Sequence, residues 1–252
     1  SRHRLYKQKD ILGQNKKILA KPILGTKDVM ADYIEDLQIS NVVNLSNLYI
    51  INKYANQIDI YDTVAKKQIG YIKHNNARYA VDIAAGKDGF LYTTNNKLSQ
   101  IDIWDPVAKK HVGYIKAEVM HNITAGNDGY LYTHTANDKI NIYDPVAKKK
   151  IGFIKRDGYG GAITAGQDGY IYINNGQVQQ IDIYDPVAKK KIGFIKNVPC
   201  PGDIRAAKDG YIYSSNGCKG QIDIYDPVAK KKIGYIKSLR TGAITSGKNG
   251  YL

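Results

Sequence analysis

Asp82 and Asp203 are two carboxylates that stand at the same place in two copies of a repeated sequence pattern, without belonging to the repeated residues themselves. Each comes at the start of a short segment of small residues. Two carboxylates at a defined separation, with pKa values driven apart, can perform acid–base hydrolysis. Carboxylates at a strand start can also cap a turn or line a polar channel. We favour this second interpretation, because most other aspartates have a structural place in the repeat.

Arginine is scarce in this chain and is concentrated in the connections between repeats. Two of the six arginines lie within the first four residues. The guanidinium group offers a planar fork for carboxylate, phosphate or sulfate, and tyrosine is an effective contact residue at interfaces. The predicted ligand- or partner-binding residues are Arg78, Tyr79, Arg156, Tyr159, Arg205 and Arg240, together with Asp82 and Asp203.

The two cysteines, Cys200 and Cys218, fall in two connections of the same repeat. Both connections open on the same face, and both depart from the repeat where the cysteine occurs. This favours a disulfide, which stabilises a fold by constraining the unfolded chain and is typical of oxidising compartments. The prediction is therefore an extracellular or cell-envelope protein. The alternative is two unpaired loop thiols and a cytoplasmic location.

The sequence shows no motif for a cofactor or a catalytic nucleophile. The five histidines, His3, His74, His111, His121 and His134, lack the spacing of a helical metal site. Three of them, at positions 74, 121 and 134, are expected in loops on one face, so a surface metal site is the alternative. No Gly-x-Ser-x-Gly elbow, phosphate-binding glycine loop or Cys-x-x-Cys pair occurs. The sequence predicts no cofactor, no catalytic residue, no metal ligand and no enzyme activity.

A five-residue pattern, Ile-Asp-Ile-Tyr-Asp, recurs along the chain and indicates the elements that position these residues. Its copies lie at residues 58–62, 101–105, 140–144, 181–185 and 222–226. Each repeat contains four short strands, separated by an Asp-Gly turn, a polar loop and an Asp-Pro turn. A four-strand repeat of about 40–45 residues is typical of a β-propeller blade. The small-residue strand belongs at the centre and the Lys-flanked strand at the outer edge.

The number of repeats predicts the domain organisation. Complete four-strand units are expected over residues 38–73, 79–116, 120–155, 161–196 and 202–237. Residues 1–37 are expected to form a degenerate half-blade and connection, with a candidate helix at Lys27–Leu37, and residues 238–252 a closing half-blade. The prediction is one all-β domain over residues 1–252. This domain is expected to be a six-bladed β-propeller closed by the two ends of the chain, with Tyr251–Leu252 beside Leu5–Lys7. The alternative is a fragment of a longer propeller.

Residues 162–196 resemble the YVTN family of β-propeller repeats in their Asp-Gly turn, Tyr-Ile-Tyr strand, Ile-Asp-Ile-Tyr-Asp-Pro strand and Lys-Lys-Lys-Ile-Gly-Phe-Ile-Lys strand. The sequence Ile103-Trp104-Asp105 is also similar to the Trp-Asp repeat, but the Gly-His dipeptide of that family is missing from every unit. The resemblance covers residues 38–252. It implies the propeller fold. It implies little about function, because the YVTN family includes surface proteins, binding scaffolds and a minority of enzymes.

The composition indicates a globular protein with a large positive charge. The chain has 252 residues, 43% of them hydrophobic, and a net charge of +14. No run approaches the roughly 18 apolar residues of a membrane-spanning helix. Most of the excess charge comes from lysines of the repeated outer strand, where lysine blocks edge-to-edge pairing. An anionic partner is therefore plausible, whereas a nucleic acid is not the favoured partner.

The repeats differ from one another mainly on one face. The Asp-Pro-Val-Ala-Lys hairpins and the Asp-Gly turns hardly change between copies, whereas the connections on the opposite face change almost completely. Divergence confined to one face is what a recognition surface produces. We therefore expect a non-enzymatic propeller that binds a protein, a glycan or an anionic surface. The alternatives are an enzyme or electron-transfer-associated propeller with an axial site, and a structural module. The oligomeric state is left open.

Overall fold

The computed structural model describes residues 47–118, 121–135, 138–156, 158 and 160–238 in full, and residues 6–9 and 15–18 as backbone. The chain separates into two compact units, residues 1–42 and 43–252. In the part of the chain that is described, no helix is long and apolar enough to cross a membrane. The single-domain organisation stays a prediction.

The first unit contains one antiparallel strand pair. Strand β1 (Tyr6–Lys9) pairs with β2 (Asn15–Ile18), and Tyr6 lies opposite Ile18. The sequence predicted a degenerate half-blade within residues 1–37. The candidate helix at Lys27–Leu37 lies outside the described residues.

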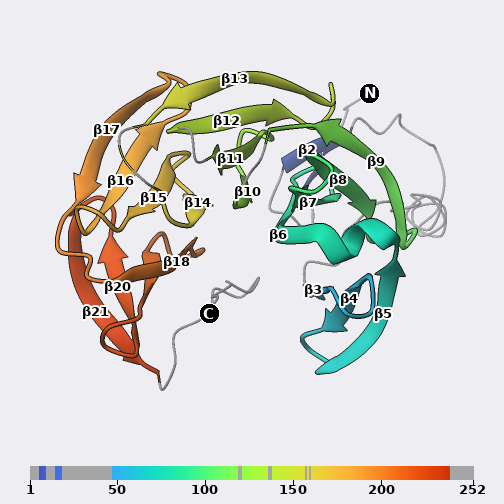
Figure 1. The fold of residues 1–252 in the computed structure, drawn as a ribbon, viewed down its shortest axis with the longest axis horizontal. Coiled ribbons are helices and arrows are strands. Elements are labelled where there is room, and N and C mark those ends of the chain that lie inside the picture. Colours follow the sequence, from blue (N-terminus) through green and yellow to red (C-terminus); the bar gives the residue numbers. More distant parts are fainter. Residues whose placement is uncertain are drawn as a thin grey trace. The chain divides into compact units, whose positions relative to one another are not determined.

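The second unit is an all-β propeller whose antiparallel sheets, called here blades 1 to 5, follow one another in the sequence (Figure 1). Each strand pairs with the next strand in the chain. Blade 1 has three strands among the described residues, and the other four blades have four strands each. The strands are β3 (Asn47–Asn52), β4 (Gln57–Asp62) and β5 (Lys67–Lys73); β6 (Ala80–Ala85), β7 (Leu91–Asn95), β8 (Gln100–Asp105) and β9 (Lys110–Lys116); β10 (Ile123–Ala125), β11 (Leu131–Thr135), β12 (Lys139–Asp144) and β13 (Lys149–Lys155); β14 (Ile163–Ala165), β15 (Ile171–Asn175), β16 (Gln180–Asp185) and β17 (Lys190–Ile195); β18 (Pro201–Ala206), β19 (Ile212–Asn216), β20 (Gln221–Asp226) and β21 (Lys231–Lys237).

The strand order from centre to edge is the predicted one. The small-residue strands β6, β10, β14 and β18 lie near one another at the centre, and the Lys-flanked strands β5, β9, β13, β17 and β21 form the outer edge (Figure 1). The prediction of a β-propeller built from four-stranded antiparallel blades is confirmed.

The hydrophobic core lies between neighbouring blades rather than inside one of them. Between blades 2 and 3, Ile101 and Ile103 of β8 and Ile115 of β9 pack against Leu131 and Tyr143 of the next blade. The same arrangement recurs between blades 1 and 2, 3 and 4, and 4 and 5. Both faces of the middle strands are therefore buried. This explains why the pentapeptide carries isoleucine on one face and an aromatic residue on the other.

The hairpins between the third and fourth strands are alike in every blade. Asp62 accepts hydrogen bonds at Oδ1 from the backbone N–H groups of Val64 and Ala65, at 2.8 and 2.9 Å, and Asp105 does the same one blade further on. Each hairpin ends on a lysine with a positive φ, near 52° in every blade. A β-bulge follows at the same place in each fourth strand, which twists the exposed edge.

A carboxylate is buried in the middle of four of the described blades. The four residues are Asp59, Asp102, Asp182 and Asp223, none more than 5% exposed. In blade 2, Asn95 Nδ2 and Gln100 Nε2 donate to Asp102 at 2.8 and 2.5 Å. The second residue of the fourth strand adds a partner in each blade, and this residue is Gln68, His111, Lys191 or Lys232. The aspartate of the repeat is thus a structural hydrogen-bond centre.

Blade 3 lacks this acid, and a glutamate in the connection before β10 supplies the negative charge instead. Asn141 occupies the aspartate position, and Lys150 Nζ pairs instead with Glu118 Oε1 at 2.5 Å. Asn141 Nδ2 donates to the other oxygen of Glu118 at 3.3 Å. The hydrogen bond from Lys150 is the main cause that holds the pKa of Glu118 below its usual value. One of the two glutamates of the chain therefore replaces a missing repeat residue in space.

The prediction of six blades is wrong, because the structure shows five. Strands β1 and β2 pair with each other within the first unit, and residues 239–252, expected to close the propeller beside Leu5–Lys7, lie outside the described residues. Among the described residues, no further blade packs against the outer strand of blade 5. Ile236 is 44% exposed, whereas its counterparts in blades 1 to 4, such as Ile72 and Ile195, are 0% exposed because a following blade covers them.

Candidate functional site

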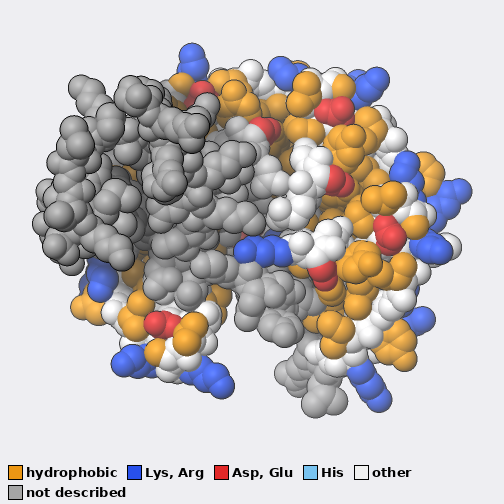
Figure 2. All heavy atoms as spheres, turned by 180° about the vertical axis from the view of Figure 1, so that it is seen from behind, with side chains coloured by type: hydrophobic (Ala, Val, Ile, Leu, Met, Phe, Trp, Pro, Cys, Tyr) orange, Lys and Arg blue, Asp and Glu red, His pale blue; other side chains and the backbone are white. Residues whose placement is uncertain are grey.

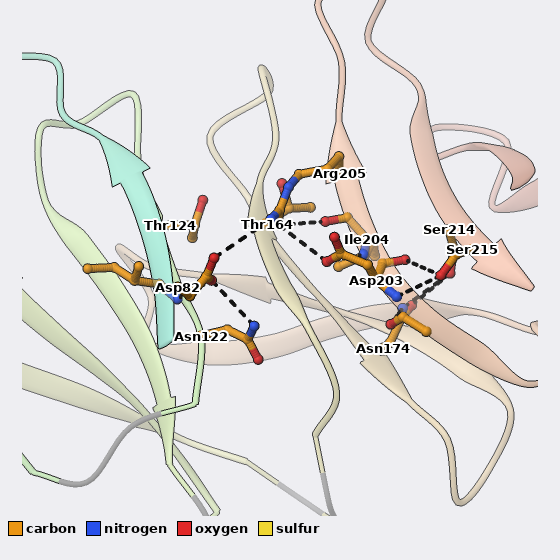
Figure 3. Close-up of polar contacts among 12 residues, drawn as sticks. Asp82, Asn122, Thr124, Thr164, Asn174, Asp203, Ile204, Arg205, Ser214 and Ser215 are labelled. Carbon is orange, nitrogen blue, oxygen red and sulfur yellow. Dashed lines mark hydrogen bonds and ion pairs between the residues drawn. The ribbon is translucent and has the colours of Figure 1, made fainter. Parts of the chain in front are cut away.

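Side chains of the central strands form hydrogen bonds from blade 2 to blade 3, from blade 3 to blade 4 and from blade 4 to blade 5. Asp82 Oδ2 in blade 2 accepts a hydrogen bond from the backbone N–H of Ile123 in blade 3, at 2.9 Å. Thr124 Oγ1 accepts one from a backbone N–H of β14 at 3.1 Å, and Thr164 Oγ1 accepts one from β18 at 3.0 Å. Figure 3 shows these residues around the centre of the propeller. These hydrogen bonds hold the central strands of neighbouring blades in position.

Arg205 stands where blades 3 and 4 have threonine, and its guanidinium lies between two carboxylates (Figure 3). Nη1 is 3.5 Å from Asp203 Oδ1, and Nη2 is 3.9 Å from Asp82 Oδ1. Asp82 belongs to blade 2, whereas Asp203 and Arg205 both belong to β18 of blade 5. The structure therefore brings three of the predicted site residues together. Arg205, which was predicted to act with the arginines in or just after the variable connections, lies on the central strand β18.

The axial aspartates serve as hydrogen-bond acceptors for the backbone. Asp82 Oδ1 accepts from Ile83 N at 2.9 Å, in addition to the bond that its Oδ2 accepts from blade 3. Asp203 Oδ1 accepts from Ile204 N at 2.9 Å. An acid–base pair needs a carboxyl group that is available to exchange a proton. Because both oxygens of Asp82 are already engaged, this arrangement suits a structural ion-pair network.

The opposite end of each blade has a constant backbone and variable side chains. The turn between the second and third strands ends on a residue with φ between 48° and 57° in every blade: Asn56, Ser99, Asp138, Gln179 and Gly220. The carbonyl oxygen of this residue accepts a hydrogen bond from a backbone N–H just after the outer strand in all five blades. The donor is the first residue after that strand in four blades and Val198 in blade 4. We call the surface formed by these turns and connections the variable face.

The side chains on the variable-face turns share neither charge nor size. The tips expose Tyr54, Leu98 and Val178, with exposed fractions of 103%, 45% and 57%. In the turn of blade 5 the corresponding positions hold Cys218 and Lys219. A repeated framework thus carries different contact groups, which the divergence of these loops in the sequence had indicated.

Arg78 and Tyr79 lie together at the end of a short 3-10 helix, η1 (Asn75–Tyr79). Lys97 Nζ donates to Tyr79 Oη at 3.1 Å and lies 4.4 Å from the ring centroid, and the Arg78 guanidinium carbon is 5.3 Å from the same centroid. These cations lower the pKa of the Tyr79 hydroxyl, mainly through the Lys97 hydrogen bond. Lys97, which the sequence did not indicate, completes a cationic patch around an aromatic ring.

Arg156 lies between blades 3 and 4 and is buried, at 4% exposed. Its Nη2 donates to Gly158 O at 2.7 Å, while its Nε and Nη1 have no hydrogen-bond partner in the described part of the chain. The structure therefore does not place Arg156 on the exposed surface beside Arg78. Tyr159 and Arg240 lie outside the described residues.

His134 was expected in a loop, but the structure places it on β11, where it is 3% exposed. Its Nε2 hydrogen-bonds to Gly160 O at 3.0 Å, so Nε2 carries the proton. The pKa of His134 is lowered from 6.5 to about 3, mainly by burial and to a smaller extent by the nearby Arg156 and His121. A neutral, buried imidazole in this position predicts pH-dependent stability.

We expect the free energy of unfolding to fall as the pH is lowered from 6.5 to about 3, because the unfolded chain binds a proton at His134 that the folded chain does not. The contribution of this residue is about 1 kcal/mol per pH unit. His134→Gln keeps a donor for Gly160 O and should flatten the pH profile measured by urea unfolding at pH 4 to 7. The comparison variant is His121→Gln at an exposed position, which removes only the smallest of the three causes of the shift and should keep most of the slope. Equal slopes for wild type and His134→Gln would contradict the assignment.

Cys200 and Cys218 form the predicted disulfide, with their Cα atoms 5.7 Å apart. The bridge connects the segment before β18 to the turn between β19 and β20. Gly217 N also donates to Cys200 O at 3.2 Å. Both halves of the bridge lie on the variable face of blade 5, so the disulfide fixes one part of that face.

In the parts of the chain that the structure describes, no group of three or more His, Cys, Asp or Glu could hold a metal ion.

The position of Arg205 at the axis could have been predicted by aligning the repeats with one another. At the position of Arg205, the other described blades carry Ala84, Thr124 and Thr164. A position-by-position comparison of the central strands therefore identifies Arg205 as an axial residue.

Comparisons with known proteins bear on the fold. No family model and no curated protein matches the chain. Among solved structures, the chain is similar to a chain of hydrazine synthase from Kuenenia stuttgartiensis, with a TM-score of 0.61 and 14% sequence identity, over 81% of this chain and 87% of that one. At this level of identity the likeness shows the fold alone. The comparisons thus place this chain among the β-propellers.

Proposed function

We propose that this chain is a non-enzymatic recognition module, with YVTN-type repeats, that binds a protein partner with acidic groups through its variable face. The observation that carries the proposal is the constant backbone of the variable-face turns, which displays a different set of side chains in each blade. Binding residues concentrate on loops that a rigid scaffold positions. The alternative of an enzyme with an axial site has less support, because the axial carboxylates accept structural hydrogen bonds.

The chemistry of the exposed groups supports a protein partner. Tyr54 and Leu98 offer separate apolar contacts, and the cationic patch of Arg78, Lys97 and Tyr79 offers hydrogen bonds to carboxylates. Tyrosine and arginine are the residue types that dominate interface hot spots. The Cys200–Cys218 disulfide is compatible with an extracellular or cell-envelope location. We include that location in the proposal.

The proposal predicts that the triple variant Tyr54→Ala, Arg78→Ala and Lys97→Ala weakens the partner at least about tenfold, since each hot-spot side chain contributes more than about 1 kcal/mol. A variant with Lys149→Ala, Lys190→Ala and Lys231→Ala, at the hairpin ends of the outer strands, should bind almost as wild type does. Affinity is measured by surface plasmon resonance with the partner that photo-crosslinking identifies. The opposite ranking of the two variants would place the binding surface elsewhere.

The partner is obtained with a photo-crosslinking amino acid at position 54, on the variable face, and separately at position 187, on a hairpin of the opposite face where Val187 is 88% exposed. We expect a discrete protein adduct from position 54 in an extract of the source organism, competed by unlabelled wild-type protein, and no such adduct from position 187. Identical adducts from both positions would refute a face-specific partner.

A further inference from the structure

Every described blade exposes an aromatic ring at the same position of its outermost strand. The rings belong to Tyr71, Tyr114, Phe153, Phe194 and Tyr235, with exposed fractions of 51%, 57%, 46%, 38% and 61%. The next residue of each strand is isoleucine, and in blades 1 to 4 it is 0% exposed because it packs between blades. Inter-blade packing therefore explains the isoleucine and leaves the repeated ring unexplained. A large apolar group that stays exposed in every repeat indicates a contact surface.

Lysine ammonium groups lie close to three of these rings. Lys139 Nζ lies 4.9 Å from the centroid of Phe153, Lys196 Nζ lies 5.4 Å from that of Phe194, and Lys232 Nζ lies 5.4 Å from that of Tyr235. Each outer strand also ends on an exposed lysine or is directly followed by one. None of these five lysines at the strand ends has an acidic partner among the described residues. We call the five rings and these lysines, Lys73, Lys116, Lys155, Lys196 and Lys237, the rim band.

The rim band follows the outer edge of the propeller. Strands β5, β9, β13, β17 and β21 lie one after another along that edge (Figure 1). In a space-filling view, hydrophobic side chains and basic side chains lie next to one another along the upper and right-hand edges (Figure 2). In blade 4 the band continues into a shallow hollow of about 340 Å³, lined by residues 177–180, Lys196 and Asn197. Three of the residues at 177–180 are glutamines, whose amides can hydrogen-bond to hydroxyl groups.

We propose that the rim band binds an acidic polysaccharide. Aromatic rings stack on the apolar faces of sugar rings, and the unpaired lysines complement carboxylate or sulfate groups. A flexible polymer can follow successive blades, so that contacts that are weak singly add up to firm binding. A flat anionic membrane can touch only part of a curved edge. The disulfide favours a compartment outside the cytosol, where acidic polysaccharides are more accessible than single-stranded nucleic acids.

The test uses polygalacturonate as the probe and isothermal titration calorimetry with the full chain as the measurement. Wild type should bind polygalacturonate and not neutral dextran, with an affinity that falls as salt rises. Replacing the five rim aromatics by serine should weaken binding at least about tenfold, because the contacts of all five rings with the sugar units are lost. The matched control replaces Val64, Val107, Val146, Val187 and Val228, the exposed valines of the opposite-face hairpins, by serine and should bind as wild type does.

A second measurement needs no variant. Bound polygalacturonate should protect Lys73, Lys116, Lys155, Lys196 and Lys237 from acetylation, as read by mass spectrometry, while Lys97 on the variable face stays reactive. Three results would overturn the proposal: unchanged affinity of a folded aromatic variant, tighter binding of poly(dT) than of polygalacturonate, or preferential binding to anionic phosphatidylserine vesicles. Residues 177–179 of the hollow in blade 4 belong to the variable face, but the five aromatic rings lie on the outer strands. Loss of polysaccharide binding in the aromatic variant and loss of the protein partner in the variant of Tyr54, Arg78 and Lys97 are therefore separate results.

Discussion

Replacing Asp102 by alanine is expected to lower the free energy of unfolding by about 3–5 kcal/mol, the cost of removing one partner from a buried, charged hydrogen-bond network. The Asp102 carboxylate is 0% exposed and accepts bonds from Asn95, Gln100, Asn76 and His111, at 2.5 to 3.0 Å. Without the carboxylate, these donors lose their acceptor inside the blade. Urea unfolding at pH 7, followed by circular dichroism, measures the loss.

Asn141→Ala provides the matched control, because Asn141 occupies the same position in blade 3. Its side chain donates one bond, at 3.3 Å, and its Oδ1 has no partner in the described part of the chain. We expect a loss of about 1 kcal/mol for this variant. If Asp102→Ala cost no more than Asn141→Ala, the buried carboxylate would not be the centre that holds blade 2 together.

The Asp102 network also has a defined pH dependence. Burial alone would raise the pKa of Asp102, but the hydrogen bonds from His111, Asn95, Asn76 and Gln100 together hold it below the usual 3.8. A carboxyl whose pKa is lower in the folded state stabilises the protein above its unfolded value and loses this contribution as the pH falls through the folded value. The difference between wild type and Asp102→Ala should therefore be full at pH 7 and shrink below pH 3.8.

Removing the Cys200–Cys218 disulfide is expected to lower the free energy of unfolding by about 3 kcal/mol, from the chain-entropy cost of a loop of this length. The double variant Cys200→Ser and Cys218→Ser should unfold at a lower urea concentration than the oxidised wild type. Reductant should destabilise the wild type and leave the double variant unchanged. This contrast separates the loss of the bridge from other effects of the reducing agent.

Intact-mass analysis after alkylation tests the bridge directly. Under non-reducing conditions the wild type should take up no label, because the two cysteines are joined. Two labels per chain would show free thiols and would remove the support for a location outside the cytosol.

Much of the fold follows from local patterns of residues. The strand segments, the Asp-Pro hairpins and the Asp-Gly turns depend on residues within a few positions of one another, so each repeat carries enough information to predict them. The pentapeptide aspartate was also correctly interpreted as structural. The pairing of Cys200 with Cys218 was predictable for a related reason, since both depart from the repeat within a single blade.

Other features depend on contacts between residues far apart in the chain, which a repeat pattern does not encode. Glu118 replaces the acid that Asn141 lacks because the two side chains meet across 23 positions of sequence. Arg205 was predicted with the variable connections, yet it lies at the axis between Asp82 and Asp203 because the central strands of blades 2 and 5 converge there. The count of five blades depended on which strands pair with which, and the exposure of the rim aromatics depended on which neighbours cover each strand. Burial and pairing of this kind are set by packing between blades, and packing exists only once the chain has folded.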